Sequence, residues 1–104
     1  MKPELRIDIL KDITSKVDVP LVLHGGSSNK DEEIAAAVDN GICKINISSD
    51  IKVAFYTQCR KTLNENLGYR EPLEIYPEAM EACGKVVEEK IRLFKSNDKV
   101  KYYY

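Results

Sequence analysis

At positions 21–27 the chain reads Leu-Val-Leu-His-Gly-Gly-Ser. A short apolar run closed by two glycines predicts a strand that ends in a tight turn, and a run without polar alternation is typical of a parallel sheet with both faces buried. Residues 42–47 predict a second strand, in which Lys44 and Asn46 alternate with apolar residues. Because the interval between the strands holds a helix, we expect parallel neighbours joined by a right-handed crossover.

Apolar residues at helical spacing predict helices around these strands. Asn29 and Glu32 are predicted to form a capping box at the start of a helix, and Asn40 and Gly41 are predicted to end it. Pro77 is suited to a first helical turn, so it is predicted to open the last helix after a loop. The remaining assignments are helices at 4–17 and 49–67, a loop at 68–76, and inward-facing residues Ile51, Ala54, Phe55, Cys59, Leu63 and Leu67 in the third helix and Met80, Cys83, Val87, Ile91 and Phe94 in the fourth.

Length and charge exclude several classes of protein. The chain has 104 residues, with 16 Lys and Arg against 17 Asp and Glu, a net charge of −1. This length suits one domain and is too short for a complete (β/α)₈ barrel of about 250 residues. Near-neutral charge argues against a nucleic-acid partner. No apolar run approaches the roughly 18 residues of a membrane span, so no membrane association is expected.

The three cysteines favour an intracellular, reducing environment. Cys43, Cys59 and Cys83 lie at apolar-periodic positions, so we expect them to be buried as small hydrophobic residues. There is no Cys-x-x-Cys pair, and an odd number of cysteines does not suggest a disulfide framework. The start of the chain lacks a secretion signal. The expected location is therefore cytoplasmic.

Two strands are too few for an independent sheet, because three or more are normally needed. We therefore expect residues 1–104 to form a single partial domain of a larger α/β structure, with residues 96–104 as a flexible tail. Such a chain is expected to be unstable alone or oligomeric, covering its exposed strand with another copy or with a missing segment.

The chemistry is predicted at the carboxyl ends of the two strands, where parallel α/β folds place their sites. Two glycines allow close backbone approach, and successive amides followed by a helix N-terminus form an anion-binding concavity. Phosphate is the ligand that these features favour. The residues in question are His24, Gly25, Gly26 and Ser27 after the first strand and Asn46, Ile47, Ser48 and Ser49 at the second.

Structural roles compete with each of these assignments. The two glycines can form an ordinary tight turn, and His24, the only histidine, can be a structural residue. One imidazole cannot hold zinc by itself, since a catalytic site needs about three protein ligands. Ser48, Ser49 or Asp50 can cap the following helix, and Asp50 suits that role better than contact with a phosphate. Lys44 can line a barrel interior or reach solvent.

Four segments in order resemble the class II, metal-dependent ketose-bisphosphate aldolases of the fructose- and tagatose-bisphosphate types. The similarity extends from about Leu5 to Phe94, and it implies a TIM (β/α)₈ barrel. This chain then corresponds to the C-terminal part of that barrel: about the last two βα units, the seventh and eighth, plus C-terminal helices. The segments are 20–27, 31–34, 44–50 leading into Ala54 and Phe55, and 88–94.

The resemblance also implies roles for the strand-end residues. His24 matches one of three zinc-binding histidines, and Asn46 matches the residue beside the enediolate. The implied reaction is reversible aldol cleavage of a ketose bisphosphate to dihydroxyacetone phosphate and an aldehyde, with zinc as the Lewis acid and a carboxylate elsewhere moving the proton. The implied phosphate-binding residues are Gly25, Gly26, Ser27, Ile47, Ser48 and Ser49.

The departures from this pattern matter as much as the matches. The family's two other metal histidines and its catalytic aspartate lie upstream, and nothing here replaces them. Ser28 stands where many relatives have glycine. We therefore expect a fragment that carries one zinc ligand and part of the phosphate site, and that is inactive alone. Arg92, on the last helix, can reach a neighbouring subunit's substrate or simply face solvent.

Two readings from other classes stay open. The first is a non-catalytic phosphate-binding or assembly module derived from a barrel. The second is a truncated product without a function of its own. Metal content distinguishes the first from an aldolase part, because a binding module should hold phosphate without zinc.

Overall fold

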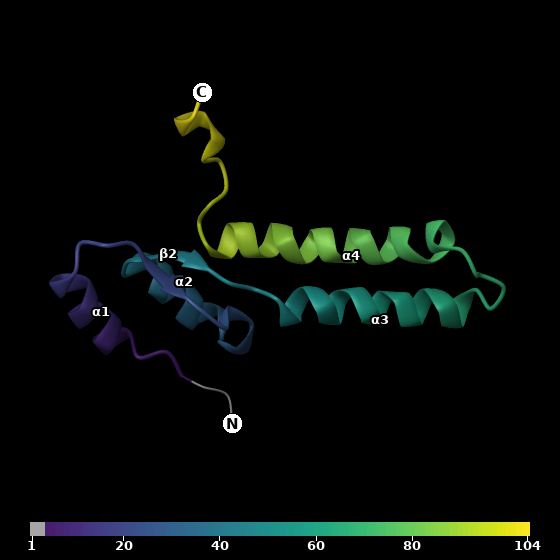
Figure 1. Ribbon diagram of the computed structural model, residues 1–104, viewed down its shortest axis with the longest axis horizontal. Helices are drawn as coiled ribbons and strands as arrows, with labels where there is room; N and C mark the ends of the chain where they lie inside the picture. Colours follow the sequence, from purple (N-terminus) through teal and green to yellow (C-terminus); the bar gives the residue numbers. More distant parts are fainter. Residues whose placement is uncertain (1–3) are drawn as a thin grey trace. The chain divides into compact units, whose positions relative to one another are not determined.

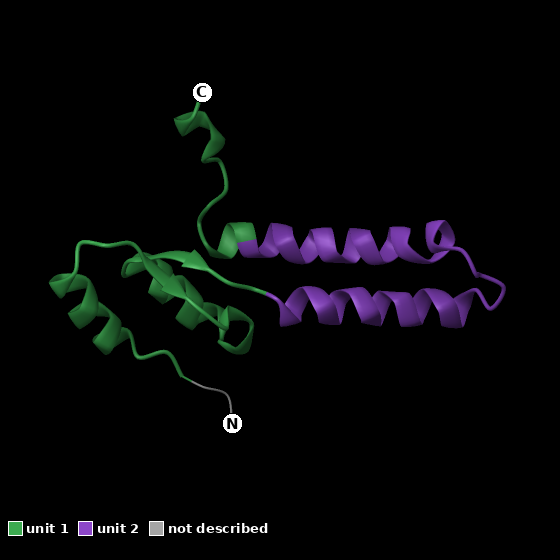
Figure 2. Cartoon of the chain, in the orientation of Figure 1, with its two compact units in different colours: residues 1–47, 91–104 green, residues 48–90 purple. Residues whose placement is uncertain are grey.

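The computed structural model describes residues 4–104, and contacts divide them into two units (Figure 2). The first unit runs to Ile47 and resumes at Ile91, while the second comprises Ser48–Lys90. The first unit contains both strands, and the second is a pair of helices (Figure 1). The strand ends predicted to carry the chemistry thus belong mainly to the first unit.

The sheet of the first unit pairs β1 (Leu21–Leu23) with β2 (Ile42–Ile45). The strands are parallel, as predicted. Leu21 lies opposite Ile42 and Val22 opposite Lys44, so the register skips Cys43 at an irregularity. The prediction that β1 is buried on both faces is wrong for the described chain, because Val22 is 44% exposed.

Two helices accompany the sheet. α1 (Ile7–Lys16) and β2 both pack against α2 (Asp31–Asp39). Ile34 of α2 is only 1% exposed, and Ala37, one turn further, is also buried. The capping box predicted at Asn29 is wrong, since the N-cap position of α2 is Lys30, which makes no side-chain capping bond. A carbonyl at Lys30 accepts the first helical bond, so the helix begins one residue later than expected.

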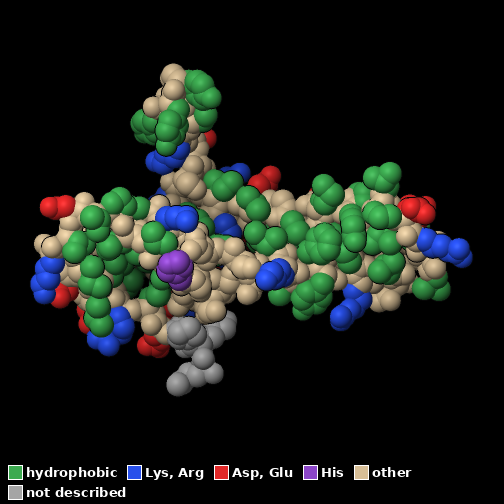
Figure 3. Space-filling model, viewed as in Figure 1, with side chains coloured by type: hydrophobic (Ala, Val, Ile, Leu, Met, Phe, Trp, Pro, Cys, Tyr) green, Lys and Arg blue, Asp and Glu red, His purple; other side chains and the backbone are tan. Residues whose placement is uncertain are grey.

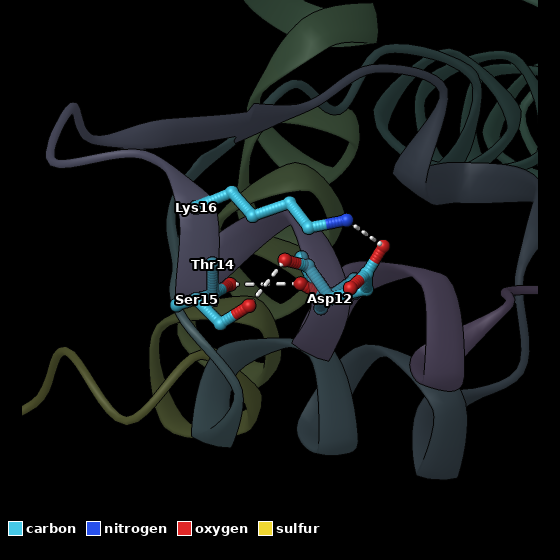
Figure 4. Close-up of polar contacts among 5 residues, drawn as sticks. Asp12, Thr14, Ser15 and Lys16 are labelled. Atoms are coloured by element: carbon cyan, nitrogen blue, oxygen red, sulfur yellow. Dashed lines mark hydrogen bonds and ion pairs between the residues drawn. The ribbon is translucent and has the colours of Figure 1, made fainter.

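Thr14 ties α1 to the turn between α2 and β2. Figure 4 shows its hydroxyl on α1 beside the local contacts of Ser15 with Asp12 and of Lys16 with Asp12. The same hydroxyl donates to the carbonyl of Asn40 at 3.1 Å. Gly41 follows with φ +111°, and a Cβ there would lie 2.9 Å from Thr14 Oγ1. The turn therefore needs glycine for two reasons, backbone conformation and space.

We expect Gly41→Ala to lower the free energy of unfolding of the chain by about 1–3 kcal/mol, the range for a residue held in a disfavoured backbone region. Urea unfolding followed by circular dichroism measures the change. Gly68→Ala is the control, because a Cβ at Gly68 meets nothing within 4 Å. Equal effects of the two substitutions would contradict the contact between Gly41 and Thr14.

The second unit is formed by α3 (Ser49–Glu65) and most of α4 (Pro72–Leu93). Thr62 is completely buried, and its hydroxyl donates to Glu78 Oε2 at 2.6 Å. Asp50 pairs with Lys90 at 2.9 Å near the other end. These polar contacts join the two helices along their length.

The start of α4 differs from the prediction: residues 68–71 are outside the helices as expected, but the loop assigned to 68–76 is wrong from Pro72 on. The helix begins at Pro72, which suits a first helical position because its missing N–H has no helical partner there. The Glu74 carboxylate accepts bonds from the backbone amides of Arg70 and Glu71 at 3.2 and 3.4 Å. Pro77 lies inside the helix instead of opening it.

The inward faces predicted for the helices are only partly correct. In α4 the fully buried residue is Ala79, whereas Met80 is 66% exposed and Val87 and Ile91 are also exposed. In α3, Leu63 is exposed, and Leu67 is exposed beyond the end of the helix. Figure 3 shows hydrophobic side chains over the visible face of the helix pair. The contact between α3 and α4 therefore includes small and polar residues, Ala79 and Thr62, as well as the predicted Phe55, whose ring lies 5.5 Å from that of Tyr76.

The cysteines and the C-terminal stretch complete the description. Cys59 and Cys83 are partly buried, but Cys43 is exposed, so the predicted burial of Cys43 is wrong. Its place at the register irregularity removes it from the ladder with β1. Lys95 forms an ion pair with Asp39 of α2, and a short 3₁₀ turn, η2 (Val100–Tyr102), follows. Among residues 4–104, no helix combines the length and apolar character of a bilayer span.

Candidate functional site

The carboxyl ends of β1 and β2 lie at the same edge of the sheet, as parallel pairing requires. Asn46, directly after β2, makes two backbone bonds to the turn after β1. Its N–H donates to the Leu23 carbonyl at 3.0 Å, and its own carbonyl accepts from the Gly26 N–H at 3.2 Å. The Asn46 side chain reaches His24, with Nδ2 lying 2.9 Å from Nδ1. His24 and Asn46, both predicted at the strand ends, are therefore in direct contact.

The two glycines of the turn have different reasons to be glycine. Gly25 adopts the left-handed conformation, with φ 70° and ψ 30°, and a Cβ there would meet nothing within 4 Å. Gly26 is buried, and a Cβ there would lie 2.6 Å from Ile45 Cγ2 and 3.1 Å from Ile47 Cδ1. Gly25 is required for the turn's shape, whereas Gly26 is required for its close approach to β2.

A short 3₁₀ turn, η1 (Gly26–Ser28), follows and uses several of the amides that the sequence offered to an anion. The Ser28 N–H donates to the Gly25 carbonyl at 3.2 Å, and the Asn29 N–H donates to the Gly26 carbonyl at 3.4 Å. With the Gly26 N–H bonded to Asn46, three amides of this turn donate within the protein. Fewer backbone amides of this turn therefore remain to bind an anion than the sequence suggested.

The other predicted binding residues follow β2. Ile47 is the last residue of the first unit, and Ser48 and Ser49 belong to the second. Ser48 is the N-cap position of α3 and Ser49 its first helical residue, with no side-chain capping bond from Ser48. Asp50 was expected to cap this helix, but it lies inside the first turn and pairs with Lys90. The two serines therefore lie at the start of α3, as the capping alternative proposed, but the Ser48 side chain makes no capping bond.

Two basic residues singled out by the sequence are both exposed. Lys44 lines a small hollow of about 150 Å³ with Phe94 and Val38. Arg92 lies near the end of α4 with its side chain in solvent. Exposure allows Arg92 to reach a neighbouring molecule, which stays a prediction.

The described residues supply one candidate ligand for a zinc ion, His24, and do not supply a complete ligand set. His24 is exposed and offers an imidazole, which is a common zinc ligand. Among residues 4–104 there is no group of three or more His, Cys, Asp and Glu side chains that would hold a metal ion. A catalytic zinc site needs about three protein ligands, so further ligands must come from outside this set.

Sequence reasoning placed both strand ends in one site but missed the direct contact between two of its residues. His24 was assigned as a zinc ligand and Asn46 as the residue beside the enediolate, although both lie one residue beyond the ends of paired strands. That matching position was the available signal, because residues directly after neighbouring parallel strands face the same edge. The backbone bonds that fix Asn46 against the turn have no signature in the sequence.

Comparison with known proteins gives a consistent result. The family model described as fructose-bisphosphate aldolase class-II matches residues 1–99. The chain is 34% identical over 102 residues to a sulfofructosephosphate aldolase of Alkalicoccus urumqiensis, covering 98% of this chain and 36% of the relative. It is 36% identical over 92 residues to the D-tagatose-1,6-bisphosphate aldolase subunit GatY of Klebsiella oxytoca, covering 88% of this chain and 32% of the relative.

A solved structure agrees with these sequences. The crystal structure of the YdjI aldolase from Escherichia coli K12 is similar to this chain with a TM-score of 0.81 and 33% identity. The match covers 91% of this chain and 35% of the YdjI chain. The chain thus spans about a third of the length of the relatives that it matches.

Proposed function

The chain belongs to the class II fructose-bisphosphate aldolase family, and on that premise we propose that it is part of an enzyme that reversibly cleaves a ketose bisphosphate. The products are dihydroxyacetone phosphate and an aldehyde, and the substrate is fructose 1,6-bisphosphate or tagatose 1,6-bisphosphate. The contact between His24 and Asn46 across the two strand ends carries this proposal, because it assembles two of the inferred site residues.

The fold proposed for the whole enzyme is a TIM barrel. The parallel pair β1 and β2, with α2 between them in sequence, is the unit from which such a barrel is built. In this arrangement the two strands are the last two of the barrel, and their carboxyl ends lie on its active face. The loops after strands 7 and 8 are the usual phosphate site of barrels.

The residues of this chain have distinct roles in the proposed enzyme. Gly25, Gly26 and Ser27 form the turn that receives the phosphate of dihydroxyacetone phosphate. Asn46 lies beside the reacting carbons, while Ile47, Ser48 and Ser49 continue the phosphate site. His24 supplies one imidazole nitrogen to a zinc ion whose other ligands lie elsewhere. When bound, zinc acts as a Lewis acid on the substrate ketone.

The partners proposed for the chain follow from its incomplete site. It binds a phosphorylated sugar and associates either with the rest of the barrel or with another copy of itself, in the cytoplasm. An alternative proposal is an assembly module that keeps phosphate binding without catalysis. The incomplete ligand set among residues 4–104 favours this alternative if no partner completes the site.

The decisive experiment mixes the purified chain with a polypeptide carrying the part of Klebsiella oxytoca GatY outside the matched region. Size-exclusion chromatography with light scattering measures assembly, and release of dihydroxyacetone phosphate measures cleavage of the two bisphosphates with added zinc. We expect no turnover from either piece and zinc-dependent turnover from the complex. His24→Ala in the chain is the control, which should assemble without cleaving.

Two results would contradict the proposal. Turnover by the chain alone would show that its own residues complete the site. A stable homo-oligomer that ignores the GatY polypeptide and binds inorganic phosphate without zinc would favour the assembly module, and the ligand role of His24 should then be dropped.

A further inference from the structure

The helix pair of the second unit has a polar side and an apolar side. On the polar side, charged and amide side chains line a hollow of about 480 Å³, among them Gln58, Lys61 and Lys85. On the other side, apolar residues recur at helical spacing and stay exposed. This apolar face comprises six residues that are 39–89% exposed, Tyr56 and Leu63 of α3 and Leu73, Tyr76, Met80 and Val87 of α4.

Both helices contribute to the same side of the pair. The ring of Phe55, the residue before Tyr56 in α3, lies 5.5 Å from that of Tyr76 in α4. Tyr56 and Leu63 are seven residues apart, and Tyr76 and Met80 are four apart, so each set follows one side of its helix. Figure 3 shows hydrophobic side chains gathered over both helices. A contiguous apolar face that contains Tyr and Met is typical of a protein contact surface.

Two charged residues accompany this face. Lys52 lies one turn before Tyr56, on the same side of α3. Glu88 follows Val87 and lies about two and a half turns from the buried Ala79, which places it on the outer edge of α4. The face therefore has a cation on one helix and an anion on the other.

These two charges lie at the same level along the helix pair. The ion pair between Asp50 and Lys90, 2.9 Å long, joins the start of α3 to the end of α4. Because the helices run in opposite directions, Lys52 and Glu88 are each two residues inward from that pair. Both are exposed, and the ion pairs of residues 4–104 include neither of them.

We propose that this apolar face binds the apolar face of a second copy of the chain, about a two-fold axis parallel to the helices. The rotation lays α3 of one copy over α4 of the other and keeps every residue at its level along the axis. Lys52 of each copy then lies opposite Glu88 of the other, so the symmetric contact gains two ion pairs while it buries the apolar side chains.

The matched level of the two charges favours a second copy over another partner, since only a two-fold rotation requires that the cation and the anion share one level. The inference goes beyond the proposed function, because this association requires neither zinc nor a sugar phosphate. Its test measures self-association and is independent of turnover.

Sedimentation equilibrium on the full chain measures the dissociation constant of the dimer. Met80→Glu places a carboxylate within the apolar face, and we expect the dissociation constant to rise at least about 30-fold, as for the loss of an interface hot spot. Thr57→Glu is the matched control, since it adds the same group at an exposed position of α3, one turn before Lys61 on the polar side. It should leave the dissociation constant unchanged.

Mixing two variants tests the pairing of Lys52 with Glu88. In Lys52→Glu two carboxylates face each other at each contact, and in Glu88→Lys two ammonium groups do. We expect each variant alone to dimerise at least about tenfold more weakly, because like charges repel. An equal mixture should recover the affinity of the unsubstituted chain, since the heterodimer restores both contacts. Salt at about 1 M should reduce these differences by screening.

Circular dichroism of each variant checks its helical content, so that unfolding is not mistaken for dissociation. A chain that stays monomeric would overturn the inference, and so would a mixture that dimerises no better than its components. Met80→Glu that blocks assembly with the GatY polypeptide but leaves self-association intact would assign the apolar face to the rest of the enzyme instead. Turnover by the complex tests the aldolase role separately from all of these results.

Discussion

Ile34→Ala is expected to lower the free energy of unfolding by about 2–5 kcal/mol, the range for removing a large buried aliphatic side chain. Ile34 is 1% exposed, and among residues 4–104 the other buried hydrophobic residues are Ala37 and Ala79. Ile34 therefore supplies the largest fully buried apolar side chain of this small core. The loss combines the transfer free energy of the removed atoms with the cavity that remains between α2 and its neighbours.

Ile9→Ala in α1 is the matched control, because it deletes the same atoms from a side chain that is 46% exposed. We expect it to change stability by a fraction of the Ile34 effect, as is usual for surface positions. Light scattering should first fix the oligomeric state, since association would add to apparent stability. Urea unfolding then gives both values. Equal losses from the two substitutions would show that α2 is not the core of the first unit.

The fold could be predicted where strong local signals occur. Pro20 and the Gly25-Gly26 pair bracket β1, and Asn40-Gly41 separates α2 from β2, so the observed strands lie within the predicted ranges. α4 was missed at its start because two prolines, Pro72 and Pro77, both suit a first turn. Only the contacts of Glu74 with the preceding amides decide between them.

Burial was harder to predict than the elements themselves. Periodicity places Met80 and Val87 on an apolar face, but the helix pair approaches through Ala79 and Thr62, where small and hydrogen-bonded side chains allow contact. Cys43 lies at an apolar position of the alternating pattern in residues 42–47. The register irregularity nevertheless skips it, so it has no partner residue in the ladder with β1. Such details depend on which surfaces meet, and a single sequence does not encode them locally.

The candidate site shows the same division. Adjacent parallel strands predict that His24 and Asn46 end at one edge, and the structure places them in contact. The use of the Gly26, Ser28 and Asn29 amides within the turn could not be predicted, since these bonds depend on the exact path of the backbone. The phosphate-binding roles assigned to the other site residues, including Ser48 and Ser49, stay predictions.

Gly26→Ala is expected to disrupt this site by its volume alone. The backbone of Gly26 is not in the left-handed region, so alanine carries no conformational penalty there. Its Cβ would nevertheless lie 2.6 Å from Ile45 Cγ2, a branched side chain with little rotational freedom, and 3.5 Å from the Asn46 carbonyl. Forcing an extra methyl group into such a contact costs about 1–3 kcal/mol. The turn can relieve it only by moving away from β2.

That movement would stretch the bond from the Gly26 N–H to Asn46 and separate His24 from the carboxamide. In the chain labelled with ¹⁵N-histidine, His24 is the only histidine and gives the only ring-nitrogen signals. We therefore expect Gly26→Ala to shift these ¹⁵N signals and to abolish any change in them when inorganic phosphate is added. Gly25→Ala is the matched control, since it meets no atom within 4 Å but must hold alanine at φ 70°. It should cost about 1–2 kcal/mol while leaving the His24 signals in place. If Gly25→Ala moved those signals and Gly26→Ala did not, the turn's conformation, and not its close approach to β2, would be what assembles the site.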